Sequence, residues 1–167
     1  MRTAVALGSN LGNRLDNLRA ARKAIAALAG VEPPILFSLI YETDPVDCEP
    51  DAETFLNAVL EFDYEGDSME LLKKLREIEK TLGRPLDHVR NTSRKIDIDL
   101  LYFGDANIAD EELQLPHPRM HLRSFVLQPL ADIRSGLVFS GQTKTVRELL
   151  AQVADSGKVV RTEWKLE

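Results

Sequence analysis

The stretch Arg94-Lys95-Ile96-Asp97-Ile98-Asp99-Leu100-Leu101-Tyr102-Phe103 decides the fold, because apolar and acidic residues alternate along it. Successive side chains of a β-strand point to opposite faces, so the alternation predicts a strand over 96–103. The two isoleucines and Leu100 then share one face of the strand, and Asp97 and Asp99 share the other. We expect helices to cover the apolar face.

The chain before this strand alternates between helical and extended patterns. Its expected elements are a strand over 2–7, a helix over 14–29, strands over 35–43 and 55–62, and a helix over 68–82. The helices are indicated by apolar residues that recur at steps of three and four. Together with the last strand they give the order β-α-β-β-α-β, the ferredoxin-like arrangement of helices on a largely antiparallel sheet.

The residues after this core are expected to extend it. They suggest a helix near 120–130, a short strand near Val138, a helix over 146–153 and a strand over 159–164. A length of 167 residues suits one compact domain. We therefore predict an α+β fold, with a ferredoxin-like βαββαβ core and C-terminal additions, in a single domain over 1–167.

The composition argues against several classes of protein. The chain is 44% hydrophobic and 29% charged, which is typical of a globular protein. No apolar run approaches the roughly 18 residues that span a bilayer, and Thr3–Leu7 is too short for the core of a secretory signal. We expect a cytoplasmic protein with no membrane partner. The single cysteine, Cys48, cannot form an internal disulfide and is assigned no role.

The net charge of −6 hides an asymmetry. Between Glu42 and Glu70 there are eleven acids and no lysine or arginine, so the rest of the chain carries +5. A basic remainder suits a phosphorylated ligand, although a solvated acidic face alone would also explain the pattern. The acidic stretch and an aromatic content of 6% disfavour a nucleic-acid partner.

Asp97 and Asp99 form the most informative polar pair. They lie two strand positions apart, which is roughly 6.5 Å along the chain. Mg²⁺ prefers oxygen ligands and usually takes one or two carboxylates together with substrate phosphates. The pair can therefore hold one or two Mg²⁺ ions, with Arg94 and Lys95 nearby as cations for phosphoryl transfer. The solvent-facing side of an ordinary strand is the alternative.

A second stretch, Leu115–Phe125, is rich in potentially cationic side chains at the start of an expected helix. These side chains are His117, Arg119, His121 and Arg123. Helix N-termini and arginine side chains both suit phosphate, while a basic exposed first turn is the alternative.

Three further residues allow two interpretations each. Phe55 and Phe125 are typical core residues when taken singly, but together they can sandwich a flat heterocycle. Asn57 interrupts an apolar strand, and burying an amide is costly unless it is hydrogen-bonded. It either fixes the strand register or reads the amide edge of a ligand.

Six motifs occur in a specific order and spacing. They are Ala6–Gly12, Tyr41–Val46, Phe55–Val59, Ile78–Arg84, Arg94–Leu100 and Pro116–Phe125. Together they resemble the 6-hydroxymethyl-7,8-dihydropterin pyrophosphokinases of folate biosynthesis, over nearly all of residues 3–140. The resemblance implies a transferase that moves pyrophosphate from ATP to the hydroxymethyl group of the pterin and releases AMP.

The resemblance also implies roles for individual residues. It implies two Mg²⁺ ions held by Asp97 and Asp99. The catalytic residues that it implies are Arg84, Arg94, Asp97 and Asp99. It implies contacts to ATP by Glu79, Arg94, Leu100, His117 and Arg123. It implies a pterin site in which Phe55 and Phe125 stack on the ring and its polar edge is read by Thr43, Pro45, Val46 and Asn57. The implied partners are these small molecules, and we expect a monomer.

The chain departs from the family pattern in two loops. The segment Asp47-Cys48-Glu49-Pro50-Asp51-Ala52-Glu53 is acidic where the family usually has a glycine and a polar stretch with glutamine. Asn91-Thr92-Ser93 stands where the family often has Trp-Gly-Pro, and a second basic residue soon after Arg84 is missing. A ligand-binding module without turnover therefore remains the alternative, although the retained arginines and aspartates favour the enzyme.

Overall fold

The computed structural model describes residues 1–46, 48–83, 93–154 and 157–167. Its main strands are β1 (Arg2–Ser9), β2 (Val31–Phe37), β3 (Tyr41–Thr43), β4 (Phe55–Tyr64), β5 (Asp97–Phe103) and β8 (Val159–Arg161). They form one sheet in the order β5-β1-β4-β3-β8. β2 pairs with the second half of β4, on the same edge as β3, which pairs with the first residues of β4. Every pairing is antiparallel.

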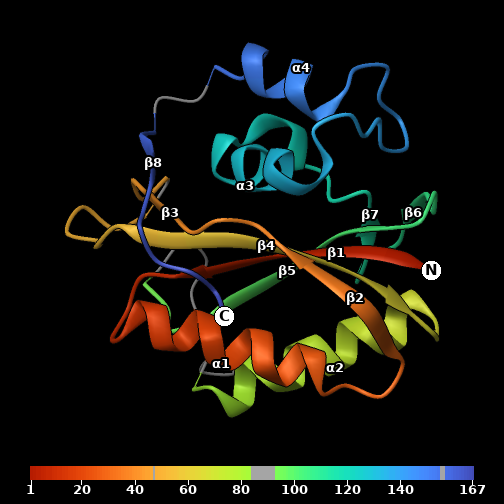
Figure 1. Ribbon diagram of the computed structural model, residues 1–167, viewed down its shortest axis with the longest axis horizontal. Coiled ribbons are helices and arrows are strands. Elements are labelled where there is room, and N and C mark those ends of the chain that lie inside the picture. The colour runs from red at the N-terminus through yellow and green to blue at the C-terminus, as the bar shows by residue number, and fades with distance from the viewer. Residues whose placement is uncertain (47, 84–92, 155–156) are drawn as a thin grey trace.

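Helices cover both faces of the sheet and make a three-layered molecule (Figure 1). They are α1 (Arg14–Ala26), α2 (Ser68–Thr81), α3 (Ser124–Arg134) and α4 (Val146–Gln152). α1 and α2 pack on one face, and α3 lies on the other with α4 outside it. No helix in the described ranges is long and apolar enough to cross a membrane.

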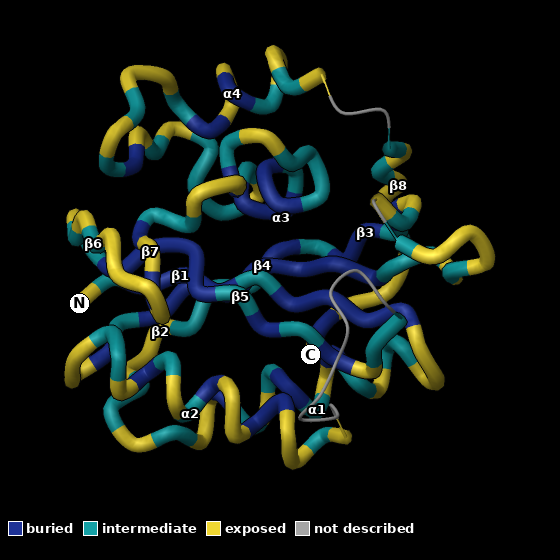
Figure 2. Tube along the Cα trace, turned by 180° about the vertical axis from the view of Figure 1, so that it is seen from behind, coloured by how far each residue is buried: buried dark blue, intermediate teal, exposed yellow. Residues whose placement is uncertain are grey.

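The central strand β4 divides its side chains between two cores. The core under α1 and α2 takes its even-numbered side chains, Leu56, Ala58, Leu60 and Phe62. Val59 points the other way, into the core under α3. The strand is buried along most of its length, and Figure 2 shows the buried band that runs through β1, β4 and β5.

The structure confirms the α+β fold class. β1 and β2 are joined by α1 and flank β4, which is the split βαβ pattern of a ferredoxin-like core. The expected single strand over 35–43 is wrong, because the chain breaks into β2 and β3 at Ser38. The Ser38 hydroxyl accepts the N–H of Val59 at 2.9 Å, the Ser38 N–H donates to the Val59 carbonyl, and the regular ladder is interrupted there.

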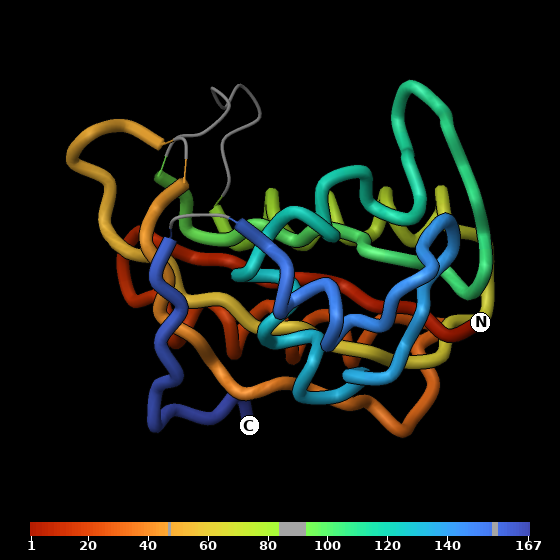
Figure 3. The backbone as a smooth tube through the Cα atoms, turned by 90° about the horizontal axis from the view of Figure 1, so that it is seen from above, coloured from red at the N-terminus to blue at the C-terminus, as the bar shows by residue number. Residues whose placement is uncertain are grey.

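Two expectations for the C-terminal half need correction, and one element there was not predicted. The helix expected near 120–130 is a 3₁₀ turn, η1 (Met120–Leu122), followed by α3, because the backbone of Arg123 is extended between them. Val138 lies in an exposed loop rather than a strand. A small hairpin of β6 (Ile108–Ala109) and β7 (Gln114–Leu115) has no counterpart in the prediction. Figure 3 shows this hairpin and the loop after β3 at opposite ends of the molecule.

Candidate active site

A pocket of about 360 Å³ opens on the α3 face of the sheet, where β1 ends and β4 and β5 begin. The strand register builds its floor, because Gly8 on β1 lies between Asn57 on β4 and Asp97 on β5. The start of α3 bounds the pocket with Phe125 and Val126. The pocket therefore lies beside the part of the sheet face that α3 covers.

Gly8 keeps the floor of the pocket open. A Cβ atom at this position would lie 3.0 Å from the Asn57 amide oxygen and 3.6 Å from the Phe55 ring. The first distance is tighter than a normal van der Waals contact, so a larger residue would displace the Asn57 side chain. The glycine in the first motif thus has a local structural reason.

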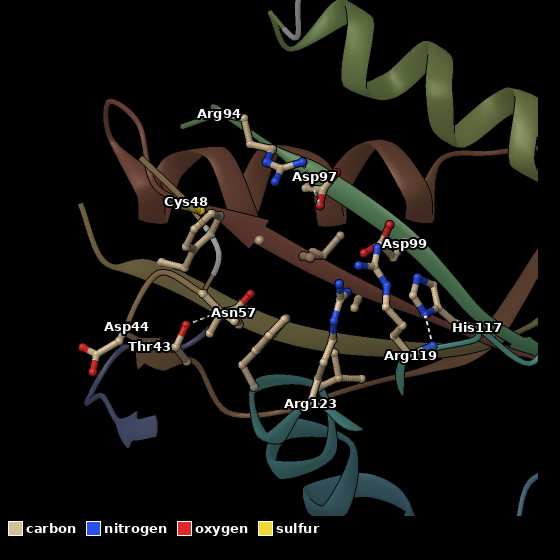
Figure 4. Close-up of a pocket in the computed structure, with 17 residues that line it drawn as sticks. Thr43, Asp44, Cys48, Asn57, Arg94, Asp97, Asp99, His117, Arg119 and Arg123 are labelled. Carbon is tan, nitrogen blue, oxygen red and sulfur yellow. Dashed lines mark hydrogen bonds and ion pairs between the residues drawn. The ribbon is translucent and has the colours of Figure 1, made fainter. Parts of the chain in front are cut away.

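The two carboxylates of β5 point into the pocket, as the alternation predicted (Figure 4). The Arg94 guanidinium lies 3.5 Å from the Asp97 carboxylate. Burial, and then the neighbouring Asp97 carboxylate, raise the pKa of Asp99 to about 7. Arg123 and Arg94 act in the opposite direction on the pKa of Asp99.

Glu79 of α2 supports the same strand from outside the pocket. It is buried, and its carboxylate accepts the backbone N–H of Ile98 at 2.7 Å. Ile98 lies between the two aspartates on β5, which is an edge strand of the sheet. The bond therefore holds the β5 backbone at the position that carries both carboxylates.

The donor set fits Mg²⁺ when a phosphorylated ligand completes it. The described part of the chain contains no group of three or more histidine, cysteine or acidic side chains able to hold a metal alone. Mg²⁺ does not need such a group, since one or two carboxylates plus substrate phosphates suffice. Asp99 also gains from a cation, because it lies beside another carboxylate and its pKa is raised.

Cationic and hydrogen-bonding groups face the carboxylates from the segment before α3. His117, Arg119 and Arg123 line the pocket on that side (Figure 4). Burial, then Arg123 and Arg119, lower the pKa of His117 to about 4, so its ring is neutral near pH 7. The Arg119 backbone N–H donates to Nδ1 of this ring at 3.2 Å. The proton of the neutral ring is therefore on Nε2, where it can be donated to an anion.

Arg94 adds a further unused donor. Its side chain is 18% exposed, and its Nε atom is buried without a hydrogen-bond partner among the described residues. A buried N–H without a partner is costly, and a ligand oxygen at this position would remove the cost. The cationic side of the pocket is therefore suited to bind an anion.

The other end of the pocket is built for a flat polar group. Asn57 and Thr43 are both buried there, and the Asn57 amide N–H donates to the Thr43 hydroxyl at 2.5 Å. This bond links β4 to β3 and satisfies part of the amide, as its burial requires. Phe55 lies close to Gly8 on the same floor, and Phe125 and Val46 also line the pocket. An aromatic heterocycle with a polar edge matches these surfaces.

A model of the 7,8-dihydro-6-hydroxymethylpterin-pyrophosphokinase family matches residues 4–135. The chain belongs to this family. A Bacillus subtilis (strain 168) relative named 2-amino-4-hydroxy-6-hydroxymethyldihydropteridine pyrophosphokinase is 45% identical over 129 residues, covering 77% of this chain and 75% of the relative. A protein of the same name from Methylorubrum extorquens is 40% identical over 156 residues, covering 93% of this chain and 96% of the relative.

Solved structures support the same fold. The HPPK-DHPS protein of Plasmodium falciparum, solved as wild type with pterin and p-hydroxybenzoate, has a TM-score of 0.69 and 16% identity to this chain. The match covers 90% of this chain and 42% of that one. A likeness at this identity concerns the fold alone.

Most residues that resemblance to the pyrophosphokinases singled out converge in the pocket. Those that line it are Thr43, Val46, Phe55, Asn57, Arg94, Asp97, Asp99, His117, Arg123 and Phe125. Glu79 lies behind β5, and the Leu100 side chain is buried in the core under α1 and α2. Pro45 precedes Val46 but does not line the pocket itself. Arg84 lies outside the described residues.

Residues to which the sequence assigned no individual role also line the pocket. They include Gly8, Asp44, Cys48 and Arg119. Arg119 was visible as part of the basic stretch, and its position two residues after His117 was the available signal. Asp44 and Cys48 lie in a loop without periodicity, so no pattern in the sequence indicated that they face the pocket.

Proposed function

We infer that the pocket is the active site of a pyrophosphokinase. The chain transfers pyrophosphate from ATP to the hydroxymethyl group of 6-hydroxymethyl-7,8-dihydropterin, in folate biosynthesis. The pterin hydroxyl oxygen attacks the β-phosphorus of ATP and its proton passes to solvent, the bond from that phosphorus to the α,β-bridging oxygen breaks, and AMP leaves. One observation carries this assignment. The Asp97 and Asp99 carboxylates and three arginine side chains line the same pocket as the buried Asn57 amide and two phenylalanines.

The pterin is proposed to lie at the end formed by β3, β4 and the start of α3. Phe55 and Phe125 would stack on its ring, and Asn57 would read its polar edge together with the backbone of the segment Thr43–Val46. The bond between Asn57 and Thr43 supports this, because it holds the amide in one orientation before any ligand arrives. Preorganised stacking would turn the hydroxymethyl group towards the aspartates.

The triphosphate is proposed to lie beside the cationic and hydrogen-bonding side chains of the pocket, which are Arg94, His117, Arg119 and Arg123. Arg94 and Arg123 would bind its oxygens, and His117 would donate its Nε2–H to one of them. Arg119 is added to this group because it lines the same pocket. Arg84 and the backbone of Leu100 would complete the ATP contacts that the family resemblance implies, whereas Glu79 lies behind β5 and acts on that strand instead. Such positioning and charge stabilisation provide most of the catalysis of phosphoryl transfer.

Asp97 and Asp99 are proposed to hold two Mg²⁺ ions. When bound, the metal would neutralise phosphate charge and lower the pKa of the attacking hydroxyl. Asp97 and Asp99 would hold the ions from one face of β5, and Glu79 holds that strand in place through its hydrogen bond with Ile98. We also propose that residues 1–167 form one domain, and that the protein is a monomer in the cytoplasm.

The reaction is tested by incubating the protein with Mg²⁺, ATP and hydroxymethyl-dihydropterin and separating the nucleotides. We expect AMP and pterin diphosphate in equal amounts, with no AMP when the pterin is omitted. Formation of ADP, or of no product, would contradict the proposal. Tight binding of both ligands without product would instead support the binding module that the altered loops left open.

A further inference from the structure

The C-terminal segment (residues 157–167) returns to the sheet beside β3. Its strand β8 pairs with β3 in antiparallel register, with Val159 opposite Thr43. The pairing continues past the end of β8, because the Thr162 N–H donates to the Ile40 carbonyl at 3.0 Å. The segment therefore covers the edge of β3 that faces away from β4 (Figure 1).

Strand β3 holds part of the pocket in place, although it has only three residues. Thr43 is buried, and its hydroxyl accepts the hydrogen bond from Asn57. Asp44 and Val46, which follow the strand, also line the pocket. β4 pairs with β3 on one side and β8 pairs with it on the other. Because two short strands alone are marginally stable, the position of Thr43 depends on β8 as well as on β4.

The residues just before β8 contact the chain just after β3. The Asp44 N–H donates to the Lys158 carbonyl, and the Lys158 N–H donates to the Asp44 carboxylate, each at 3.2 Å. A Cβ atom at Gly157 would lie 3.5 Å from Cγ2 of Val46, so the Gly157 backbone lies beside that pocket side chain. The C-terminal segment thus contacts the chain on both sides of Pro45.

The other end of the segment is anchored away from the pocket. Leu166 is 1% exposed and belongs to the core under α1 and α2. The Thr162 hydroxyl donates to the Ile40 carbonyl at 2.9 Å. The Arg19 guanidinium donates to the Lys165 carbonyl at 3.2 Å. The segment therefore gives β3 a neighbour that is fixed by contacts outside the pocket.

We propose that β8 positions β3 for the pterin, so that this C-terminal strand sets the affinity of the pocket for the pterin but not for the nucleotide. This inference rests on the proposed function. Thr43 and Val46 belong to the chain that β8 contacts, whereas the side chains proposed to bind the triphosphate lie on other elements. Of residues 157–167, all of which the structure describes, none lines the pocket. The residues of β8 are therefore positioning residues that act through the backbone of β3.

The hydrogen-bond pattern of β8 supplies a matched pair of variants. Opposite residues in an antiparallel ladder alternate between hydrogen-bonded and non-hydrogen-bonded pairs. Since Lys158 and Thr162 both bond to the chain of β3, Val160 between them is also a hydrogen-bonded position. Its N–H faces Glu42, whereas the N–H of Val159 points away from β3 on the last strand of the sheet. Proline removes a ladder bond at Val160 but is tolerated at Val159.

The test measures two dissociation constants by titration calorimetry. An ATP analogue whose α,β-bridging oxygen is replaced by methylene is titrated with Mg²⁺, and the pterin is then titrated into the saturated protein. Val160→Pro should raise the pterin Kd by about ten-fold, because a ladder bond to β3 is lost, and should leave the nucleotide Kd within about two-fold. Val159→Pro and Val160→Ala keep that bond and should leave both constants within about two-fold of the wild type.

Thr162→Val is a second test that leaves the backbone unchanged. It removes the hydrogen bond from the Thr162 hydroxyl to the Ile40 carbonyl. It should raise the pterin Kd by about three-fold without changing the nucleotide Kd. This variant decides the question if circular dichroism shows that Val160→Pro is not folded.

An unchanged pterin Kd in folded Val160→Pro would overturn the inference and leave the proposed function intact. When that variant does not fold, an unchanged pterin Kd in Thr162→Val has the same meaning. An equal rise in both constants would also overturn the inference, because β8 would then support the fold as a whole. A wild type that binds the nucleotide but not the pterin would overturn the proposed function together with this inference.

Discussion

Two carboxylate clusters on the same face of the sheet differ in their surroundings. At one end, Glu61 is 1% exposed and accepts from the Arg134 guanidinium at 2.6 Å and 2.8 Å. Tyr102 donates a short hydrogen bond to the same carboxylate. At the other end, Asp97 has the Arg94 guanidinium at 3.5 Å, and Asp99 has no hydrogen bond or ion pair with a described residue.

Helix α3 runs from one cluster to the other. Arg123, which lines the pocket, directly precedes the helix, and Arg134, which pairs with Glu61, is its last residue. The Glu61 carboxylate is fully paired within the fold, so its charge contributes to structure. The aspartates line a pocket, and we propose that their charge binds a cation together with a phosphorylated ligand. Both clusters consist of acidic residues, so it is the surroundings of each carboxylate that distinguish a structural role from a proposed binding role.

The largest expected effect follows from removing either aspartate. Asp97→Ala or Asp99→Ala should lower kcat by about 10⁴-fold, because the charge that holds the metal and aligns the phosphates is lost. The circular dichroism spectrum should remain that of the wild type, since neither side chain is part of a core cluster. A variant with wild-type turnover would refute the metal assignment.

Breaking the paired cluster should produce the opposite pattern. Glu61→Ala leaves Arg134 and Tyr102 without their buried partner, so we expect the free energy of unfolding to fall by about 3 kcal/mol. Urea titration measures this loss, and kcat of the folded fraction at low temperature should stay within about two-fold. Asp63→Ala, which removes an exposed partner of Arg2, is the control and should cost less than about 1 kcal/mol. A large fall in kcat would mean that the two clusters are not separate.

Without bound metal, the pH dependence of the free energy of unfolding should reveal how far the ionised Asp99 carboxylate destabilises the fold. The pKa of Asp99 is about 7 in the folded protein and ordinarily about 3.9, so the folded state binds more protons between these values. Stability should therefore fall as pH rises from about 4 to 7. Asp99→Asn should remove this slope and be more stable than the wild type by about 2 kcal/mol at pH 8, measured in EDTA. A variant less stable than the wild type at pH 8 would contradict the raised pKa.

Replacing Arg119 should produce the smallest of these effects. If it contacts the triphosphate, Arg119→Ala should raise the KM for ATP by about ten-fold, with the KM for pterin unchanged. Arg119→Lys should recover part of the loss, because the charge remains without the planar donors. Lys23→Ala removes an exposed charge of α1 and should leave both KM values at wild-type levels. Equal effects of the Arg119 and Lys23 variants would exclude a specific contact.

The sequence predicted the parts of the site that lie within regular elements. Alternation along β5 predicted that Asp97 and Asp99 share a face, and the pocket confirms this. The break at Ser38 escaped prediction because a side-chain hydroxyl replaces a backbone acceptor there, which leaves no periodic signal. A hydrogen bond from Ser93 to the Glu49 carboxylate joins two irregular loops, and hydrophobic periodicity does not encode which loops meet.

The most direct test of this account is a count of bound metal ions. Mn²⁺, used in place of Mg²⁺, can be titrated by electron paramagnetic resonance in the presence of the pterin and the methylene ATP analogue. We expect two ions per chain in the wild type and in Glu61→Ala, and none bound tightly in the Asp97→Asn/Asp99→Asn double variant. Two tightly bound ions in the double aspartate variant would contradict the account.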